Sequence, residues 1–325
     1  MKKSTVLMVL ALSVLLVLSG CSGGETEQKT SFPEKSIDMT ILFAAGTSPD
    51  LLGRQLADLA QKELGQPIVV NNRVGGGGAV GYQYVLNQPA DGYSIVWNSS
   101  SISTTYYQGN LPKGQDYSAF RGVAMITNEP SAISVRADAP WKTLDEFIQY
   151  AKENPGKVSV VNAGVGSFNH ITAVALEEAA GVKFNHVFTN QAAVTVLLGG
   201  QVDAIVNTVA DISKYHLSGQ VRMLGVIGEE RVDAVKDVPT VKEQGIDLTL
   251  SMYRGIAVPK DTPDDVVKIL EQAFIKAAQS ETFKEYADKN GIVIDIRGAE
   301  EFDKYMAEQD AQIAQLMEKM GLRKQ

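Results

Sequence analysis

The sequence has few of the side chains that most often carry enzyme chemistry or hold metal ions. It contains one cysteine, Cys21, and three histidines, His170, His186 and His216, in 325 residues. A single cysteine excludes a disulfide within the chain. The histidines have no neighbours at metal-ligand spacing, and His170 falls one turn into a predicted helix, where a packing role is expected. We therefore expect no metal site.

Catalytic motifs are also missing. The chain has no G-x-S-x-G, no H-E-x-x-H, no phosphate-binding P-loop, and no Ser-x-x-Lys with its companion motifs. Its acidic residues are scattered and show no paired arrangement for acid–base work. Asp203 is expected to fix a turn. The sequence therefore favours a protein that is not an enzyme and that needs no cofactor.

No apolar run is long enough to span a bilayer comfortably. The longest, residues 6–18, follows Lys2 and Lys3 and has the length of a signal peptide. Leu18, Ser19, Gly20 and Cys21 resemble a lipobox, the site where a lipoprotein signal is cut and the new N-terminal cysteine is lipidated. We expect residues 1–20 to be a lipoprotein signal peptide; the alternative is an ordinary secretory signal with a chance cysteine. Residues 21–36 are polar and predict a lipidated Cys21 followed by a flexible tether.

Basic residues are outnumbered by acidic ones. The 38 Asp and Glu against 30 Lys and Arg give a formal net charge of −8. Removal of residues 1–20, which carry two lysines and no acid, would lower it to −10. An acidic body argues against a nucleic-acid partner. Any acidic ligand must then be held by local donors.

A βαβ unit opens the folded body. Residues 39–43 form a short apolar run typical of a buried strand. The following helix is predicted with Ser48 as N-cap, Pro49 at its first position and Asp50 in its first turn, and Gly65 ends it. Residues 68–70 predict the next strand. The turn at residues 43–50 therefore offers backbone N–H groups at a helix N-terminus, which suits an anion; the alternative is a tight connection without function.

A second turn of the same kind lies downstream. Residues 158–161 predict a buried strand that leads into the small-residue segment 162–170, and a helix at 171–180 is stopped by Gly181. Neither turn contains Arg or Lys. Two such turns would suit a ligand clamped between two lobes.

The glycine-rich stretch at residues 75–81 matches a nucleotide-binding pattern literally. Gly76, Gly78 and Gly81 satisfy G-x-G-x-x-G after a strand and before a helix. The acidic partner expected about twenty residues later is missing, since residues 97–101 read WNSSS. The glycines are therefore expected to permit a sharp turn.

Many short motifs follow one another along the chain. They are FAAG (43–46) with Asp50, LGQPIVVNNR (64–73), GGGG (75–78), PADGY (89–93), AKENPGK (151–157), GVGS (164–167) with His170, LLGGQVD (197–203), DVPTV (237–241) and VP (258–259). Together they resemble the motifs of one receptor family, the solute-binding proteins of tripartite tricarboxylate transporters (Bug-type receptors). The likeness covers essentially the whole chain after the signal peptide, with its motifs in order.

The resemblance implies an α/β, two-lobe periplasmic-binding-protein-like fold with a two-strand hinge and an interlobe ligand cleft. Lobe 1 would comprise residues 37–135 plus 254–325, and lobe 2 residues 136–253. It also implies capture of a small carboxylate, held by backbone N–H groups, hydroxyls and water, and delivery to membrane permease subunits. The protein would be extracytoplasmic and attached to the membrane through its N-terminal lipid.

The predicted ligand-binding residues lie in the two turns and in the polar segments that should border the cleft. They are Ala45, Gly46, Thr47, Ser48, Asn98, Ser99, Gly164, Gly166, Ser167, Asn169, Thr189, Asn190 and Asn207. The chain departs from the family at residues 188–193, which are shorter than the usual Tyr-Lys-Gly-rich segment, and at Asn207, where an acid is common. An uncharged or amide-bearing distal end of the ligand is therefore conceivable. Two other classes stay open: a cofactor-binding oxidoreductase and a surface sensor or adhesion module.

Overall fold

A computed structural model describes residues 31–162, 164–189 and 191–325. The predicted signal peptide, Cys21, most of the predicted tether and Asn190 lie outside the described residues. By their mutual contacts, residues Phe32–Gln325 group into one compact unit. None of the helices in the described ranges is both long and apolar enough to cross a membrane.

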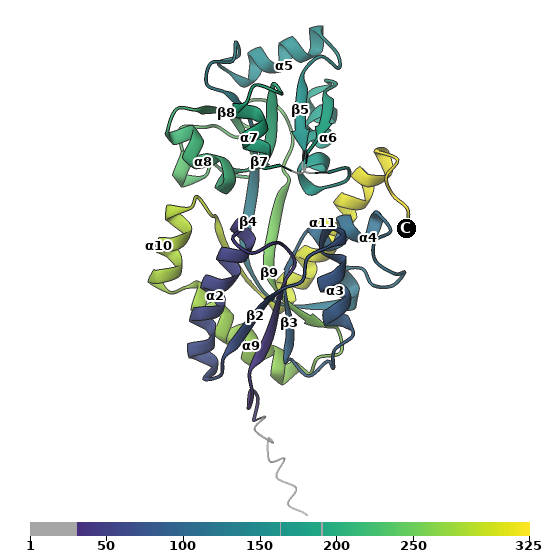
Figure 1. Cartoon of the computed structure of the whole chain (residues 1–325), viewed down its shortest axis with the longest axis vertical. Helices are drawn as coiled ribbons and strands as arrows, with labels where there is room; N and C mark the ends of the chain where they lie inside the picture. The colour runs from purple at the N-terminus through teal and green to yellow at the C-terminus, as the bar shows by residue number, and fades with distance from the viewer. Residues whose placement is uncertain (1–30, 163, 190) are drawn as a thin grey trace, which may run out of the picture. The chain divides into compact units, whose positions relative to one another are not determined.

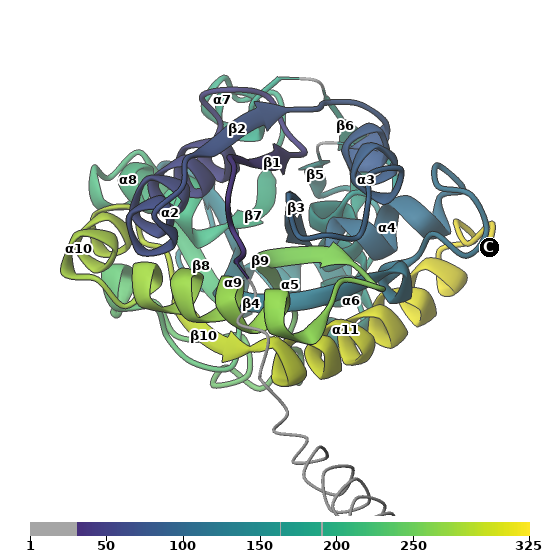
Figure 2. The ribbon, with the colours of Figure 1, turned by 90° about the horizontal axis from the view of Figure 1, so that it is seen from below.

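The first sheet is built around the predicted βαβ unit (Figures 1 and 2). Its strand order is β2-β1-β3-β9-β4, with β10 beside β4. The strands are β1 (Ile37–Ile41), β2 (Ile68–Asn72), β3 (Ser94–Ser99), β4 (Phe120–Arg136), β9 (Ser251–Pro259) and β10 (Ile294–Gly298). β1 pairs in parallel with β2 and β3, whereas β9 is antiparallel to β3 and β4. The parallel part therefore directs the carboxyl ends of three strands to one edge.

Successive side chains along these strands point to opposite faces of the sheet and contribute to two separate apolar layers. In β3, Ile95 and Trp97 pack with α2 (Ser48–Leu64) and α9 (Asp264–Ala278), while Val96 belongs to a cluster on the other face. Successive strand side chains point to opposite faces, so one strand supplies both layers. The remaining helices of this part are α3 (Ala79–Leu86), α4 (Ser101–Tyr107), α10 (Glu281–Lys289) and α11 (Ala299–Lys319).

The second sheet uses the other end of β4. Its further strands are β5 (Ser159–Asn162), β6 (Asn185–Phe188), β7 (Ala204–Thr208) and β8 (Val221–Ile227). Its helices are α5 (Leu144–Glu153), α6 (Phe168–Ala180), α7 (Ala193–Leu198) and α8 (Val209–Leu217). Ile133 and Val135 face a core shared with α5 and α6, whereas Ala132 faces a core shared with α7 and α8. This part therefore also has an apolar layer on each face of its sheet.

β4 connects the two sheets without a break. It pairs with β9 as far as Pro130, opposite Ser251, and from Ser131 onward it pairs with β7 and β8. The change of partner thus precedes residue 136, where the sequence placed the first crossing. The predicted division into lobes at residues 136 and 253 stays a prediction.

The C-terminal helix α11 contacts both parts. Phe302 and Met306 pack against β4 and β9 of the first sheet, whereas Ile313 and Met317 enter the core that contains α5 and α6. Near the end of α11, Lys319 Nζ lies 2.8 Å from a Glu178 carboxylate oxygen on α6. Besides β4, a packed helix therefore joins the two parts.

Helix ends follow the local sequence signals with two exceptions. Thr143 and Glu146 form a capping box at the start of α5, and Gly65 and Gly181 end α2 and α6 in the left-handed conformation. One exception is α6, which begins at Phe168, three residues before the predicted start at residue 171. The other is α2, which begins at Ser48 with Thr47 as its N-cap, one residue before the prediction. Because Thr47 makes no side-chain cap hydrogen bond, the first turn depends on other contacts.

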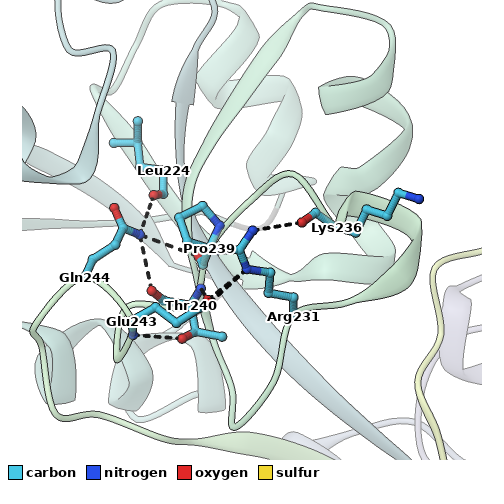
Figure 3. Close-up of polar contacts among 7 residues, drawn as sticks. All are labelled: Leu224, Arg231, Lys236, Pro239, Thr240, Glu243 and Gln244. Atoms are coloured by element: carbon cyan, nitrogen blue, oxygen red, sulfur yellow. Dashed lines mark hydrogen bonds and ion pairs between the residues drawn. The ribbon is translucent and has the colours of Figure 1, made fainter.

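The segment between β8 and β9 is held by polar contacts (Figure 3). Arg231 Nε donates to both Glu243 carboxylate oxygens at 3.0 Å, and the Thr240 amide donates to the same carboxylate at 2.7 Å. Gln244 Nε2 donates to the Leu224 carbonyl at 3.0 Å. These bonds fix the segment, which includes the short 3-10 turn η3 (Asp233–Val235), against β8.

Candidate functional site

A cavity of about 370 Å³ lies between elements of the two sheets. Residues of the first part that line it are Phe43, Pro49, Gly77, Ser101, Thr104, Thr105 and Gln108. Residues of the second part that line it are Gly164, Val165, Ser167, Phe168, Asn169, Thr208 and Asp211. Met252 and Arg254 of β9 complete the wall. The volume is near the lower end of ordinary small-molecule sites, so it suits a small ligand.

The first predicted turn reaches this cavity only at its two ends. Phe43 and Pro49 line it, whereas Ala45, Gly46, Thr47 and Ser48 are exposed and do not. The Gly46 amide donates to Asp50 Oδ2 at 2.8 Å, and the Thr47 amide donates to the Ala44 carbonyl at 3.3 Å. In this conformation the Gly46 and Thr47 amides are therefore engaged within the turn, and the expectation that the turn binds an anion stays a prediction. The carboxylate of Asp50 is the anion that accepts the Gly46 N–H.

Asp50 is fixed by three donors. Its side chain is 2% exposed and accepts hydrogen bonds from Gly46, from Asn72 Nδ2 at 2.7 Å and from Arg54 Nε at 3.0 Å. Burial alone would raise the pKa of Asp50, but the bonds from Asn72 and Gly46 and the charge of Arg54 outweigh it and lower the pKa. The carboxylate therefore stays charged and holds the turn.

The second predicted turn lies at the cavity. Gly164 and Ser167 line it, whereas Gly166 is buried behind the wall. Ser167 is the N-cap of α6, and its Oγ accepts from the His170 amide at 3.3 Å. The Gly166 amide donates to His170 Nδ1 at 3.0 Å, and the Ser167 amide donates to the Gly164 carbonyl at 3.1 Å. Gly164, Val165 and Ser167 of this turn line the cavity, and among the described residues the Gly164 and Val165 amides make no hydrogen bond.

His170 supports the second turn from behind. It is 7% exposed, and its ring lies edge-on to His186, with ring centroids 4.7 Å apart. Burial, followed by the neighbouring His186, lowers the pKa of His170 to about 4, against an opposing effect of Glu177. The ring is therefore neutral near pH 7 and can accept the Gly166 N–H. This agrees with the predicted packing role.

A hydrogen bond joins the two parts beside the cavity. Gln108 follows α4, and its Nε2 donates to the Gly166 carbonyl at 2.7 Å. Thr105 Oγ1 donates to the Gly77 carbonyl at 2.8 Å, which fixes the glycine turn η1 (Gly76–Gly78) beside the cavity. Gly75, Gly76, Gly77 and Gly78 all have positive φ, so the predicted sharp turn is confirmed.

Asn98 and Ser99 belong to the core. Both are 0% exposed, and neither lines the cavity. Asn98 Oδ1 accepts from Tyr82 Oη at 2.8 Å, and Ser99 Oγ lies 2.7 Å from Ser101 Oγ. Tyr82 of α3 bonds Asn98 and the Ser99 carbonyl, and the expectation that these two residues contact a ligand stays a prediction. Ser101 and Thr104, a few residues later on α4, line the cavity instead.

The remaining predicted residues lie around the second part. Asn169 lines the cavity, and its Nδ2 donates to Asn207 Oδ1 at 3.0 Å. Asn207 is therefore a supporting contact outside the lining. Thr189 is also outside it, with its amide donating to the Asn162 carbonyl at 3.1 Å and its Oγ1 accepting from the Gln191 amide.

Two charged lining residues escaped the sequence analysis. Arg254 Nε donates to Glu129 Oε1 at 2.9 Å, and both side chains are buried, at 6% and 5% exposure. Asp211 lies in the first turn of α8, and its Oδ2 accepts from Thr208 Oγ1 at 2.9 Å. An arginine within an otherwise apolar strand was the available signal for Arg254. No local signal distinguished Asp211 from an ordinary helix-capping acid.

No group of three or more His, Cys, Asp or Glu side chains within the described ranges could hold a metal ion. Asp203 is bonded to Ser159, whose amide and Oγ donate to its Oδ2 at 2.8 and 2.6 Å. It therefore ties β5 to the start of β7, as a structural residue.

The two α/β parts, the strand that joins them and the cavity between them define a two-lobe, periplasmic-binding-protein-like protein. Residues 52–322 match the family described as tripartite tricarboxylate transporter family receptor, and the chain belongs to this family. A Cupriavidus necator protein described as "UPF0065 protein in gbd 5'region" is 32% identical over 303 residues, covering 91% of each chain.

Solved structures support the same assignment. A TctC solute-binding protein from Polaromonas is 34% identical, covers 89% of this chain and 100% of its own, and has a TM-score of 0.77. The periplasmic binding protein BugD is 30% identical, covers 90% and 100%, and has a TM-score of 0.76.

Two structures with ligands share the fold at lower identity. MatC from Rhodopseudomonas palustris, solved with malate, is 24% identical over 88% of this chain and 99% of its own, with a TM-score of 0.75. Another R. palustris protein, solved with adipate, is 21% identical over 89% and 98%, with a TM-score of 0.78.

Proposed function

We propose that this protein is an extracytoplasmic solute-binding protein that captures a small carboxylate and does not catalyse a reaction. The observation that carries the proposal is the cavity of about 370 Å³ between the two parts, in a chain of the tricarboxylate-transporter receptor family. The size fits an organic acid of a few carbons. Malate and adipate, found in two proteins of the same fold, are ligands of this kind.

Local donors would hold the carboxylate. The hydroxyl of Ser167 and the amides of Gly164 and Val165 belong to residues of the cavity wall, as does the guanidinium of Arg254. Ser101 and Thr104 also line the cavity, but their hydroxyls already bond within the protein, to Ser99 and to the Ser101 carbonyl. Hydrogen bonds to a charged group contribute about 1.5–3 kcal/mol each. Several such donors would offset the loss of hydration of one carboxylate.

Membrane attachment and delivery are further parts of the proposal. Cys21 would be lipidated and residues 21–36 would tether the body to the membrane, so that loaded protein meets the permease subunits of a tripartite tricarboxylate-type transporter. Family membership supports the permease partner. The support for the anchor is the lipobox-like sequence before the chain's one cysteine.

A thermal-shift screen tests the proposal. Residues 31–325 are mixed with acetate, propionate, succinate, glutarate, malate, adipate, citrate, aspartate and glutamate, which we call the carboxylate panel, and with NAD. At a hundred times its dissociation constant, a ligand stabilises the folded state by about 2.7 kcal/mol. We expect a member of the panel to raise Tm. A shift with NAD alone would favour the oxidoreductase alternative, and no shift with any compound would favour the sensor or adhesion module.

A further inference from the structure

Arg254 and Asp211 are the charged side chains among the described residues that line the cavity. They come from opposite sides of it, since Arg254 lies on β9 in the first sheet and Asp211 lies on α8 beside the second. The other lining residues are neutral, so these two side chains and their partners set the charge that a ligand meets.

The charge of Arg254 is already compensated. Its Nε is 2.9 Å from Glu129 Oε1, and both side chains are almost fully buried. Its Nη2 contacts Met252 Sδ at 3.2 Å, and within the described part of the chain Nη1 makes no hydrogen bond. Arg254 can therefore donate to one carboxylate but adds no net positive charge to the cavity.

Asp211 has no cationic partner among the described residues. Its Oδ2 accepts from Thr208 Oγ1, and its Oδ1 makes no hydrogen bond to any residue that the structure describes. Arg254, Glu129 and Asp211 together carry one net negative charge. A second or third carboxylate on a ligand would be buried without a cation, which is costly. An ammonium group beside Asp211 would instead form a charge-assisted hydrogen bond.

We propose, on the basis of the carboxylate-binding function above, that the ligand also carries an ammonium group and is of the amino-acid class. Its ammonium binds Asp211, and its carboxylate binds Arg254 Nη1 together with the donors of residues 164–167. Phe43, Phe168 and Met252 supply apolar wall for the rest of the molecule. Dicarboxylates and tricarboxylates without an amine are disfavoured by the same charges.

Calorimetric titrations with matched pairs test this inference on residues 31–325. The pairs are succinate with aspartate, glutarate with glutamate, and 3-phenylpropionate with phenylalanine, so each pair differs by the amino group. We expect the amino member of at least one pair to bind at least tenfold more tightly. Asp211→Asn keeps an acceptor for Thr208 and removes the charge, and it should weaken binding of that amino acid at least tenfold.

A matched control variant tests whether the loss of affinity comes from the charge in the cavity or from the loss of an acid in the first turn of a helix. Glu146 and Asp211 each lie in the first turn of a helix after a Thr N-cap, in α5 and α8. Glu146 is exposed and does not line the cavity, whereas Asp211 is partly buried and does. Glu146→Gln should leave affinity within about twofold. Equal or tighter binding of the deaminated members, with no effect of Asp211→Asn, would overturn the amino-acid class and leave carboxylate capture standing. If no member of any pair or of the carboxylate panel binds, the proposed function itself is wrong.

Discussion

The protonation state of His170 affects the conformation of the turn at residues 164–167. Its Nδ1 accepts the Gly166 N–H at 3.0 Å, and burial lowers its pKa to about 4 from an ordinary value of 6.5. A protonated ring would carry hydrogen on Nδ1 and could no longer accept this bond. The turn that contains Ser167 therefore depends on His170 being neutral.

This dependence predicts how stability changes with pH. Because the folded pKa lies below the ordinary value, the unfolded chain takes up the proton first as pH falls. The contribution of His170 is full above about pH 6.5 and is lost as pH drops toward 4. Urea denaturation at pH 7 and pH 5 should show a drop in unfolding free energy for the wild type.

The variant His170→Asn isolates the effect, because its amide oxygen can accept near the place of Nδ1 and does not titrate. Its unfolding free energy should change less between pH 7 and pH 5 than that of the wild type. An equal change in both proteins would show that other groups cause the acid sensitivity.

Among the elements, α11 makes a contact between the two parts that the predicted two-strand hinge does not include. Met317 is 0% exposed in the core shared with α5 and α6, although its helix begins beside the first sheet. Met317→Ala should lower the unfolding free energy by about 2–5 kcal/mol through lost packing and the cavity left behind. Gln315→Ala, an exposed neighbour on the same helix, should stay within about 0.5 kcal/mol. Equal values for the two variants would mean that the end of α11 does not bind the second part tightly.

The elements themselves were largely predictable from sequence. Apolar runs and helix stop signals such as Gly65 and Gly181 are local. The structure confirms the βαβ unit and the helix predicted at residues 171–180, which begins three residues earlier, at Phe168. The orientation of polar groups was not local. Asn98 on β3 is bonded by Tyr82 of α3, sixteen residues earlier, and Asn72 of β2 bonds Asp50 of the first turn across twenty-two residues. Arg254 and Asp211 line the same cavity only because β4 joins the two sheets.

At the scale of the whole described body, the account's central claim is that the cavity between the two parts is the ligand site. Gly164 allows a direct test, because a Cβ at this position would meet no atom within 4 Å. A side chain can therefore be added here, at the cavity wall, without a steric clash at its Cβ. Gly164→Leu would occupy part of about 370 Å³, whereas Gly164→Ala adds one methyl group.

The measurement is a calorimetric titration of the wild type, Gly164→Ala and Gly164→Leu with the compound from the carboxylate panel or the matched pairs that gives the largest thermal shift. The account predicts saturable one-to-one binding by the wild type and Gly164→Ala, and at least a hundredfold loss of affinity in Gly164→Leu with an unchanged circular dichroism spectrum. Wild-type affinity in Gly164→Leu would contradict it, because the ligand would then bind elsewhere.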